Sequence, residues 1–221
     1  MARVVSLQVG RPADLPGPIG TIWSAIVKEP VDGPVILREL DFDGDQQADL
    51  SVHGGPDKAA CCYPTEHIPK WEEWLGVPVP YGAFGENLSL SGILEEDVNI
   101  GDVFEIGGAT VQVSQPRGPC FKLAARHRRK EMPAIMASAG ISGWYFRVFE
   151  EGPVEAGDEL RLTERVSEIS VAEVMRVTYR DRDDLDGLID VMAVPELAEQ
   201  WREGLEYLAR RKGLPITDFE V

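Results

Sequence analysis

The segment Thr110-Val111-Gln112-Val113-Ser114-Gln115-Pro116-Arg117-Gly118-Pro119-Cys120 joins a β-patterned run to a loop that ends on a cysteine. Pro116 and Pro119 restrict φ on either side of Gly118, so the loop is stiff. Arg117 and Lys122 place positive charge near the Cys120 thiol and favour the thiolate, which attacks electrophiles and binds metals. A free cysteine is also often a small buried hydrophobe, so this segment alone leaves a reactive and a structural interpretation open.

The flanking sequence predicts many short strands. Gly107-Gly108 has the composition of a tight hairpin turn, and Gly101-Asp102 and Gly157-Asp158 mark turns before strands. Short strands separated by turns of this kind are typical of a barrel or a sandwich. The expected strands are residues 1–7, 35–40, 103–106, 110–113, 144–149 and 159–162.

Helices are expected at five places. Thr65 can cap a helix whose Ile68, Trp71, Trp74 and Leu75 share a face, and a second helix after Cys120 would carry residues 122–130. From residue 167 the periodicity is helical. Three short helices are indicated by a capping box at Ser170 and Glu173, by apolar spacing at Leu185, Leu188, Ile189 and Met192, and by Pro195 before a stripe of Leu197, Trp201, Leu205 and Leu208.

These strand and helix patterns predict a mainly β or α+β fold. Residues 1–166 form the β-rich domain, residues 167–212 form a small three-helix domain, and residues 213–221 are a loosely held tail.

Composition bounds the class of protein. The chain has 221 residues, 43% hydrophobic content and a net charge of −16, which suits one sizeable core and argues against nucleic acid as a bulk partner. No apolar run is long enough to cross a bilayer, and the alternating start at residues 1–7 is expected to be a strand rather than a signal peptide. Three cysteines without a disulfide framework indicate a cytoplasmic, reducing setting.

Four aspartates in the segment 41–49 resemble a calcium loop. Counted from Asp41, the sixth and twelfth positions of an EF-hand are Gln46 and Val52 rather than glycine and glutamate, so the pattern fails. A solvated turn is the expected structure.

Two further segments have the composition of a binding site. His53-Gly54-Gly55-Pro56-Asp57-Lys58 could cradle an anion with backbone N–H groups and the Lys58 charge, although an ordinary turn would look similar. Phe84-Gly85-Glu86-Asn87-Leu88 offers a carboxylate and an amide, which could equally be a bulge with a hydrogen-bonded asparagine.

The remaining chemistry-bearing groups are less specific. In a basic cluster, Lys122, Arg126 and Arg129 or Lys130 would share one helix face. The cluster could be solvated, guide an anionic ligand toward Cys120 or dock an acidic partner. Its members are Lys122, Arg126, Arg128, Arg129 and Lys130. A hydrolase pairing Cys120 with His53, His67 or His127 is conceivable, and the adjacent Cys61 and Cys62 are expected in a core strand.

Taken in order, these segments resemble the MOSC domain family (molybdenum cofactor sulfurase C-terminal domain), in particular its YiiM-like branch with a C-terminal three-helix domain. The segments that carry the resemblance are 44–50, His53-Gly54-Gly55 with Lys58, 84–88, Gly101-Asp102, 115–120, and Ser142-Gly143-Trp144-Tyr145 with Arg147. The resemblance implies a β-barrel-like core that binds molybdenum cofactor (molybdopterin). It also implies an oxidoreductase that reduces N-hydroxylated compounds, such as N-hydroxylated purine bases, with electrons from a separate flavoprotein reductase.

Within this resemblance Cys120 is the expected molybdenum ligand, because molybdenum accepts a soft thiolate. Glu86 is a candidate for proton handling during N–O cleavage, and a structural carboxylate that caps a turn is an equally good interpretation of it. Cations and backbone donors would hold the phosphate of the pterin, and Asn87 and His53 could bind its edges. The expected cofactor-binding residues are Lys28, His53, Gly54, Gly55, Lys58, Asn87, Arg117 and Arg147.

Other hypotheses remain at this stage. The sequence shows no flavin, haem or iron–sulfur motif, so the chain could instead be a non-catalytic carrier or binding module for molybdenum cofactor or sulfur. The C-terminal helices could dock the electron donor or form a homodimer, whereas internal packing of the Leu197–Leu208 stripe is the favoured interpretation.

Overall fold

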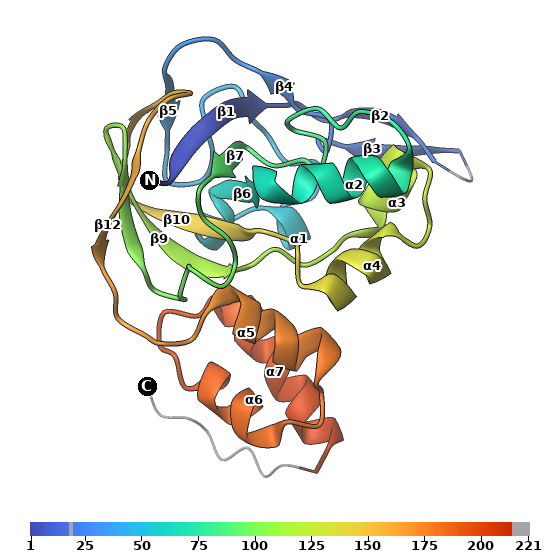
Figure 1. Cartoon of the computed structure of the whole chain (residues 1–221), viewed down its shortest axis with the longest axis vertical. Coiled ribbons are helices and arrows are strands. Elements are labelled where there is room, and N and C mark those ends of the chain that lie inside the picture. The colour runs from blue at the N-terminus through green and yellow to red at the C-terminus, as the bar shows by residue number, and fades with distance from the viewer. Residues whose placement is uncertain (18–19, 214–221) are drawn as a thin grey trace.

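A large, strongly curved β-sheet forms the centre of the molecule (Figure 1). The structure is a computed structural model and describes residues 1–17 and 20–213. Within these residues, eight strands follow the spatial order β12-β8-β9-β10-β6-β7-β1-β4, in which β6 and β7 run parallel and the other neighbours run antiparallel. The strands are β1 (Arg3–Val9), β4 (Glu29–Pro30), β6 (Ala60–Pro64), β7 (Leu88–Ser91), β8 (Val103–Ile106), β9 (Ala109–Pro116), β10 (Trp144–Glu150) and β12 (Leu160–Glu164).

The sheet curls until its two ends meet. Arg3 forms an isolated bridge with Glu159, and the Leu160 N–H donates to the Ala2 carbonyl at 3.0 Å. The strand order stays open because this contact is a short bridge rather than a full ladder. The predicted α+β class is confirmed, and the barrel-like core is a strongly curved sheet that does not close completely. Two small antiparallel pairs flank the sheet, β2 (Ala13–Pro16) with β3 (Thr21–Ser24) and β5 (Val35–Leu37) with β11 (Gly152–Val154).

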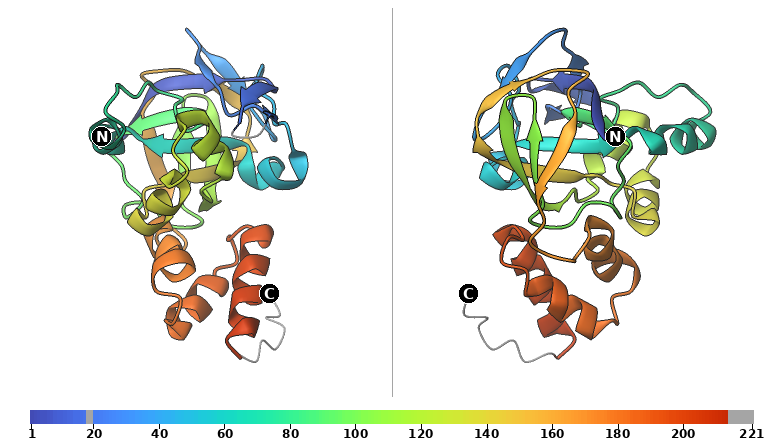
Figure 2. Two further views of the ribbon diagram at one scale, coloured as in Figure 1. Left: turned by 90° about the vertical axis from the view of Figure 1, so that its right-hand side faces the viewer. Right: turned by 60° about the vertical axis from the view of Figure 1, so that its left-hand side comes forward.

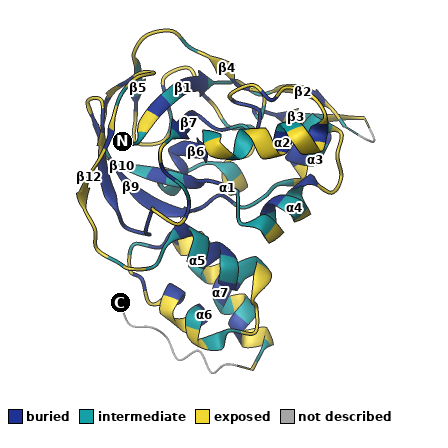
Figure 3. Cartoon of the chain, viewed as in Figure 1, coloured by how far each residue is buried: buried dark blue, intermediate teal, exposed yellow. Residues whose placement is uncertain are grey.

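Strand alternation sorts side chains between the two faces of the sheet. Cys62, Trp144 and Phe146 enter the main apolar core, which fills the inside of the curl. Tyr63 points outward and stacks on Phe84, with ring centroids 4.2 Å apart, in a second apolar cluster. Three helices cover this outer cluster: α2 (Ile68–Leu75), α3 (Phe121–His127) and α4 (Met132–Ala139). Figure 3 shows the buried strands in dark blue and the solvent-facing helix turns in yellow.

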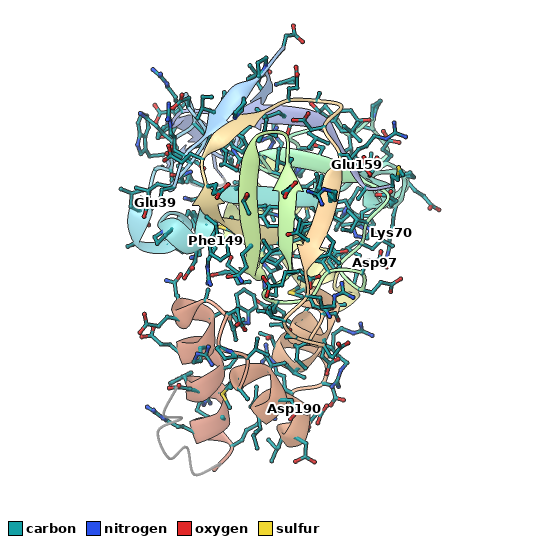
Figure 4. All side chains as sticks on the ribbon, turned by 90° about the vertical axis from the view of Figure 1, so that its left-hand side faces the viewer. Glu39, Lys70, Asp97, Phe149, Glu159 and Asp190 are labelled. Carbon is teal, nitrogen blue, oxygen red and sulfur yellow. The ribbon has the colours of Figure 1, made fainter. Side chains whose placement is uncertain are left out.

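The C-terminal helices lie beneath the sheet (Figure 2). They are α5 (Val171–Met175), a π-helical turn (Arg176–Arg180), α6 (Leu185–Met192) and α7 (Glu199–Arg211). Figure 4 shows the same arrangement with side chains, with Asp190 in the helical region below Glu159 of the sheet. Leu197 and Leu205 belong to the same apolar core as the strands, and Trp201 and Leu208 pack against it. Internal packing of the stripe is therefore confirmed, and the boundary at residue 166 stays a prediction.

Short helical turns connect the remaining segments: α1 (Leu50–His53) and two 3₁₀ turns at Pro56–Lys58 and Thr65–His67. Across residues 1–17 and 20–213, no helix combines the length and apolar character that a membrane span needs. The predicted loose tail falls mostly on residues 214–221, which lie outside the described residues.

Three predicted helix boundaries were wrong. Thr65 does not cap α2, because it opens a 3₁₀ turn, and α2 begins at Ile68 with His67 at the N-cap position. The last helix begins at Glu199 rather than Pro195, because the Ala198 N–H donates to the Ser114 carbonyl at 2.9 Å and Ala198 is extended. The helix after Cys120 ends at His127, because Arg128 adopts a left-handed conformation with φ of 54°. The predicted basic face is thereby divided, since Arg129 and Lys130 are not on the helix.

Gly143 is a point at which the fold tolerates no larger residue. Its φ is +75°, and an added Cβ would overlap the carbonyl oxygen of Cys62. We expect Gly143→Ala to lower the free energy of unfolding by about 3 kcal/mol or more, measured by urea denaturation. Gly204→Ala on α7 is the matched control, because an added Cβ there meets nothing within 4 Å. It should leave stability equal or raise it by about 0.5–1 kcal/mol, and equal effects of the two substitutions would contradict this account of Gly143.

Candidate functional site

A pocket of about 620 Å³, counted with its open mouth, lies on the outer face of the sheet. Its floor follows from strand register: Tyr145 of β10 pairs with Cys61 of β6 on one side and with Gln115 of β9 on the other. Cys61 and Tyr145 line the pocket, whereas their chain neighbours Cys62 and Trp144 face the core. Six of the predicted site residues line the same pocket: Lys28, His53, Lys58, Asn87, Arg117 and Cys120.

The loop that carries Cys120 is tied to the start of β10. The Arg117 N–H donates to the Gly143 carbonyl at 2.9 Å, and the Ser142 hydroxyl donates to the Arg117 carbonyl. Cys120 then occupies the N-cap position of α3 with a half-buried side chain. Its Sγ lies 3.5 Å from Nε2 of His53. The stiff loop thus presents a thiol to the pocket beside an imidazole.

His53 ends α1, whose first turn is capped by the carboxylate of Asp49. Burial lowers the pKa of His53 below its usual 6.5, and the positive charges of Lys122 and Lys58 lower it further. The ring is therefore neutral at neutral pH. A neutral imidazole has one acceptor nitrogen, and with Nε2 in that role His53 can take the proton of the Cys120 thiol.

Four cations line the pocket of this acidic chain: Lys28, Lys58, Arg117 and Lys122. Lys28 forms a buried ion pair with Asp45, and Arg117 donates to the Phe84 carbonyl. Lys58 donates to the Val52 carbonyl at 2.6 Å and to the Gln200 side chain, both of which are neutral. Within the described ranges, Lys122 has no ion-pair partner. The pocket therefore retains positive charge that a bound anion can use.

Asp45 corrects the prediction of a solvated turn. It is 3% exposed and accepts hydrogen bonds from the Gly10 N–H at 2.7 Å and from Asn87 Nδ2 at 2.8 Å, besides pairing with Lys28. With Gln47 Nε2 at 3.4 Å, four donors compensate the buried carboxylate.

Asn87 lines the pocket, yet the protein uses both of its N–H donors. Nδ2 donates to Asp45 and to the Gln8 carbonyl, and Oδ1 accepts from the Cys61 N–H at 3.1 Å. This geometry favours a role in holding β6 and β7 together over the predicted contact with a pterin edge.

Glu86 does not line the pocket, which corrects its placement beside a reacting group. It is 1% exposed, and its carboxylate accepts from the Gly82 and Phe84 N–H groups at 2.6 and 3.0 Å and from the Ser89 hydroxyl at 3.0 Å. Burial raises the pKa of Glu86 above its usual 4.5. The geometry supports the alternative of a structural carboxylate that shapes the turn at residues 82–86.

Arg147, Gly54 and Gly55 also lie outside the pocket lining. Arg147 is paired with Asp57 at 2.7 Å and donates to Gln112 at 3.1 Å, so it holds the turn of Lys58 against β10. Gly55 has φ of +98°, and its carbonyl accepts the Lys58 N–H at 2.9 Å. These residues support the position of Lys58 rather than facing the pocket themselves.

The sequence did not indicate Cys61 and Tyr145 as pocket residues, and Lys122, which it placed near Cys120, was not among the expected cofactor-binding residues. Both Cys61 and Cys62 are buried in the central strand β6, as predicted, but only Cys62 belongs to the main apolar core, whereas the side chain of Cys61 lines the pocket. Strand alternation indicates that Cys61 and Cys62 face opposite sides of the sheet, but it does not say which of the two faces the pocket. Burial raises the pKa of the Cys61 thiol to about 11, so this sulfur stays protonated at neutral pH.

Comparison with known proteins agrees with this arrangement. The family model of the MOSC domain matches residues 49–161, which include His53, Lys58 and Cys120. The chain belongs to the MOSC domain family. A second model, the YiiM-like 3-alpha helix domain, matches residues 169–206. Both parts of the resemblance are thereby confirmed.

Relatives of the MOSC protein are similar over most of its length. Uncharacterized protein YflK of Bacillus subtilis is 46% identical over 200 residues, which cover 90% of each chain. The crystal structure of YiiM from Geobacillus stearothermophilus has a TM-score of 0.80 and 38% identity, covering 94% of this chain and 99% of that one. A protein of Gibberella moniliformis named "Reductase" is 36% identical over 182 residues, which cover 80% of this chain and 32% of that protein.

The placement of Glu86 predicts that its main effect is on stability. Glu86→Gln turns one acceptor oxygen into an N–H₂ group that faces backbone donors, so the free energy of unfolding should fall by about 1–3 kcal/mol in urea denaturation. The exposed Glu96→Gln serves as the control and should change it by less than about 0.5 kcal/mol. Unchanged stability in Glu86→Gln would contradict the structural role.

The electrostatics of the pocket predict a response of His53 to Lys122. Removing one positive charge in Lys122→Gln should raise the pKa of His53 toward 6.5, as measured by proton NMR of the imidazole ring. The protein has three histidines, and a His53→Gln variant would assign the signal. Lys130→Gln removes a charge from an ammonium that is 91% exposed and should leave the pKa of His53 unchanged. An equal shift in both variants would contradict a local effect of Lys122.

Proposed function

We propose that this MOSC protein is a molybdenum-dependent oxidoreductase that reduces N-hydroxylated compounds with electrons from a separate flavoprotein reductase. The observation that carries the proposal is the half-buried thiol of Cys120, presented beside His53 in a cationic pocket. The sequence relative named "Reductase" supports reductive chemistry for this kind of domain.

The residues of the pocket fit a molybdenum–pterin group by the chemistry of their donors. The soft sulfur of Cys120 suits molybdenum, and thiolate is the form that binds a metal. The Lys58 and Lys122 ammonium groups suit the phosphate of the pterin. When bound, the group would supply a two-electron redox centre.

The chain's own contribution is binding and proton handling. His53 accepts the Cys120 proton as the thiol becomes a thiolate. Lys58 and Lys122 hold the anionic end of the ligand, and Tyr145 and Cys61 close the floor of the pocket. Overall, R–NHOH with two electrons and two protons yields R–NH₂ and water. The electrons must come from outside, as the proposed flavoprotein donor would supply them.

The central test is the metal content of Cys120→Ser. Protein from a molybdenum-replete host should contain molybdenum and pterin by elemental and pterin analysis, and the Cys120→Ser variant should lose most of both. Cys61→Ser is the matched control, since it exchanges the other sulfur of the same pocket and should retain the metal. Loss of molybdenum in Cys61→Ser with retention in Cys120→Ser would show that Cys61 is the ligand and would refute the assignment to Cys120.

A turnover assay distinguishes a reductase from a protein that only carries the cofactor. With a flavin reductase, NAD(P)H and 6-hydroxylaminopurine, the wild-type protein should form the amino product and Cys120→Ser should not. Protein that contains the cofactor but shows no reduction would instead be a storage or delivery module, and retained turnover in Cys120→Ser would refute the ligand role.

A further inference from the structure

The first turn of α7 lies directly behind the pocket loops. Ala198, immediately before the helix, donates to the Ser114 carbonyl of β9 at 2.9 Å. Two residues after Ala198, Gln200 accepts a hydrogen bond from Lys58 Nζ through Oε1, and its Nε2 lies 3.4 Å from the Ser51 carbonyl. A single side chain of the helical region thus touches both Lys58 and the segment that carries His53.

The contacts of Lys58 leave its charge available to a ligand. Its stem is buried, and its ammonium donates to the Val52 carbonyl and to Gln200, two neutral acceptors. An ammonium group has three donors, so one remains for the pocket that Lys58 lines. Asp57 is the neighbouring carboxylate in the sequence, and Arg147 pairs with it at 2.7 Å. Lys28, by contrast, is neutralised by Asp45.

A second contact between the helices and the pocket lies at the cysteine loop. A Cβ added to Gly118 would lie 3.6 Å from Cζ3 of Trp201 and 3.7 Å from Oη of Tyr179. These two rings pack edge to face, with centroids 6.4 Å apart. The turn that presents Cys120 therefore rests on aromatic side chains of the helical region.

We propose that the C-terminal helices support the anion-binding wall of the pocket from behind, with Gln200 as the positioning residue that holds Lys58 in place through a neutral acceptor. This inference rests on the proposed function in one respect: it names the helical residue that would help bind the phosphate of the cofactor. The amide is the useful group at position 200. A carboxylate there would hold the ammonium as well but would neutralise it.

Inorganic phosphate is the probe, titrated into the full-length protein and followed by NMR. Gln200→Ala frees Lys58 and should weaken phosphate binding roughly threefold to tenfold. Gln200→Glu should weaken it at least as much while leaving thermal stability equal or higher, a combination that a purely structural role of Gln200 does not produce. Glu203→Gln makes the reverse exchange at an exposed position of the same helix and should leave phosphate affinity unchanged.

A double-mutant cycle decides whether Gln200 acts through Lys58. In a Lys58→Ala background, Gln200→Ala should have little further effect on phosphate affinity, because the group that it positions is gone. Additive losses, or phosphate affinity unchanged in both Gln200 variants, would overturn the inference. Its failure is distinguishable from that of the proposed function, since wild-type protein without molybdenum would refute the latter and leave the phosphate cycle to judge Gln200 independently.

Discussion

The geometry of the pocket depends on the close approach of three segments at Gly143. Its carbonyl accepts the Arg117 N–H of the cysteine loop, its own N–H donates to the buried Glu95 carboxylate at 2.8 Å, and its Cα lies against the Cys62 carbonyl of β6. A side chain at this position would separate the loop from the sheet. The position of the Cys120 sulfur relative to His53 therefore depends on a glycine that touches neither residue.

The charge that lines the pocket is opposite in sign to the net charge of the chain. The chain carries 38 acidic and 22 basic residues, yet the pocket is lined by three lysines and an arginine. Buried carboxylates elsewhere are compensated by specific donors, as Asp45 is by Lys28 and Glu86 by the backbone of the turn at residues 82–86. Lys58 is held by neutral acceptors instead. Because both acceptors are neutral, they hold the Lys58 ammonium in place without cancelling the positive charge that attracts an anion.

The helical region belongs physically to the β-rich part. Its apolar side chains share one core with the strands, and Gln200, Tyr179 and Trp201 contact Lys58 and the Gly118 turn, which line the pocket. A unit that is separate in the sequence can in this way become part of the site. For the proposed anion site, a rigid wall behind the loop would reduce the entropy lost on binding.

Local patterns in the sequence determined much of this protein: the short strands, the hairpin at Gly107-Gly108, the stiff loop before Cys120, and the packing stripe of the last helix. These features depend on residues close together in the chain, through strand alternation, helical period and restricted φ. The tertiary structure alone decided which of two adjacent cysteines faces the pocket, that Glu86 is enclosed by backbone donors, and that Gln200 meets Lys58 across 142 positions. Such pairings depend on strand register and on the docking of distant elements, and no local periodicity encodes them.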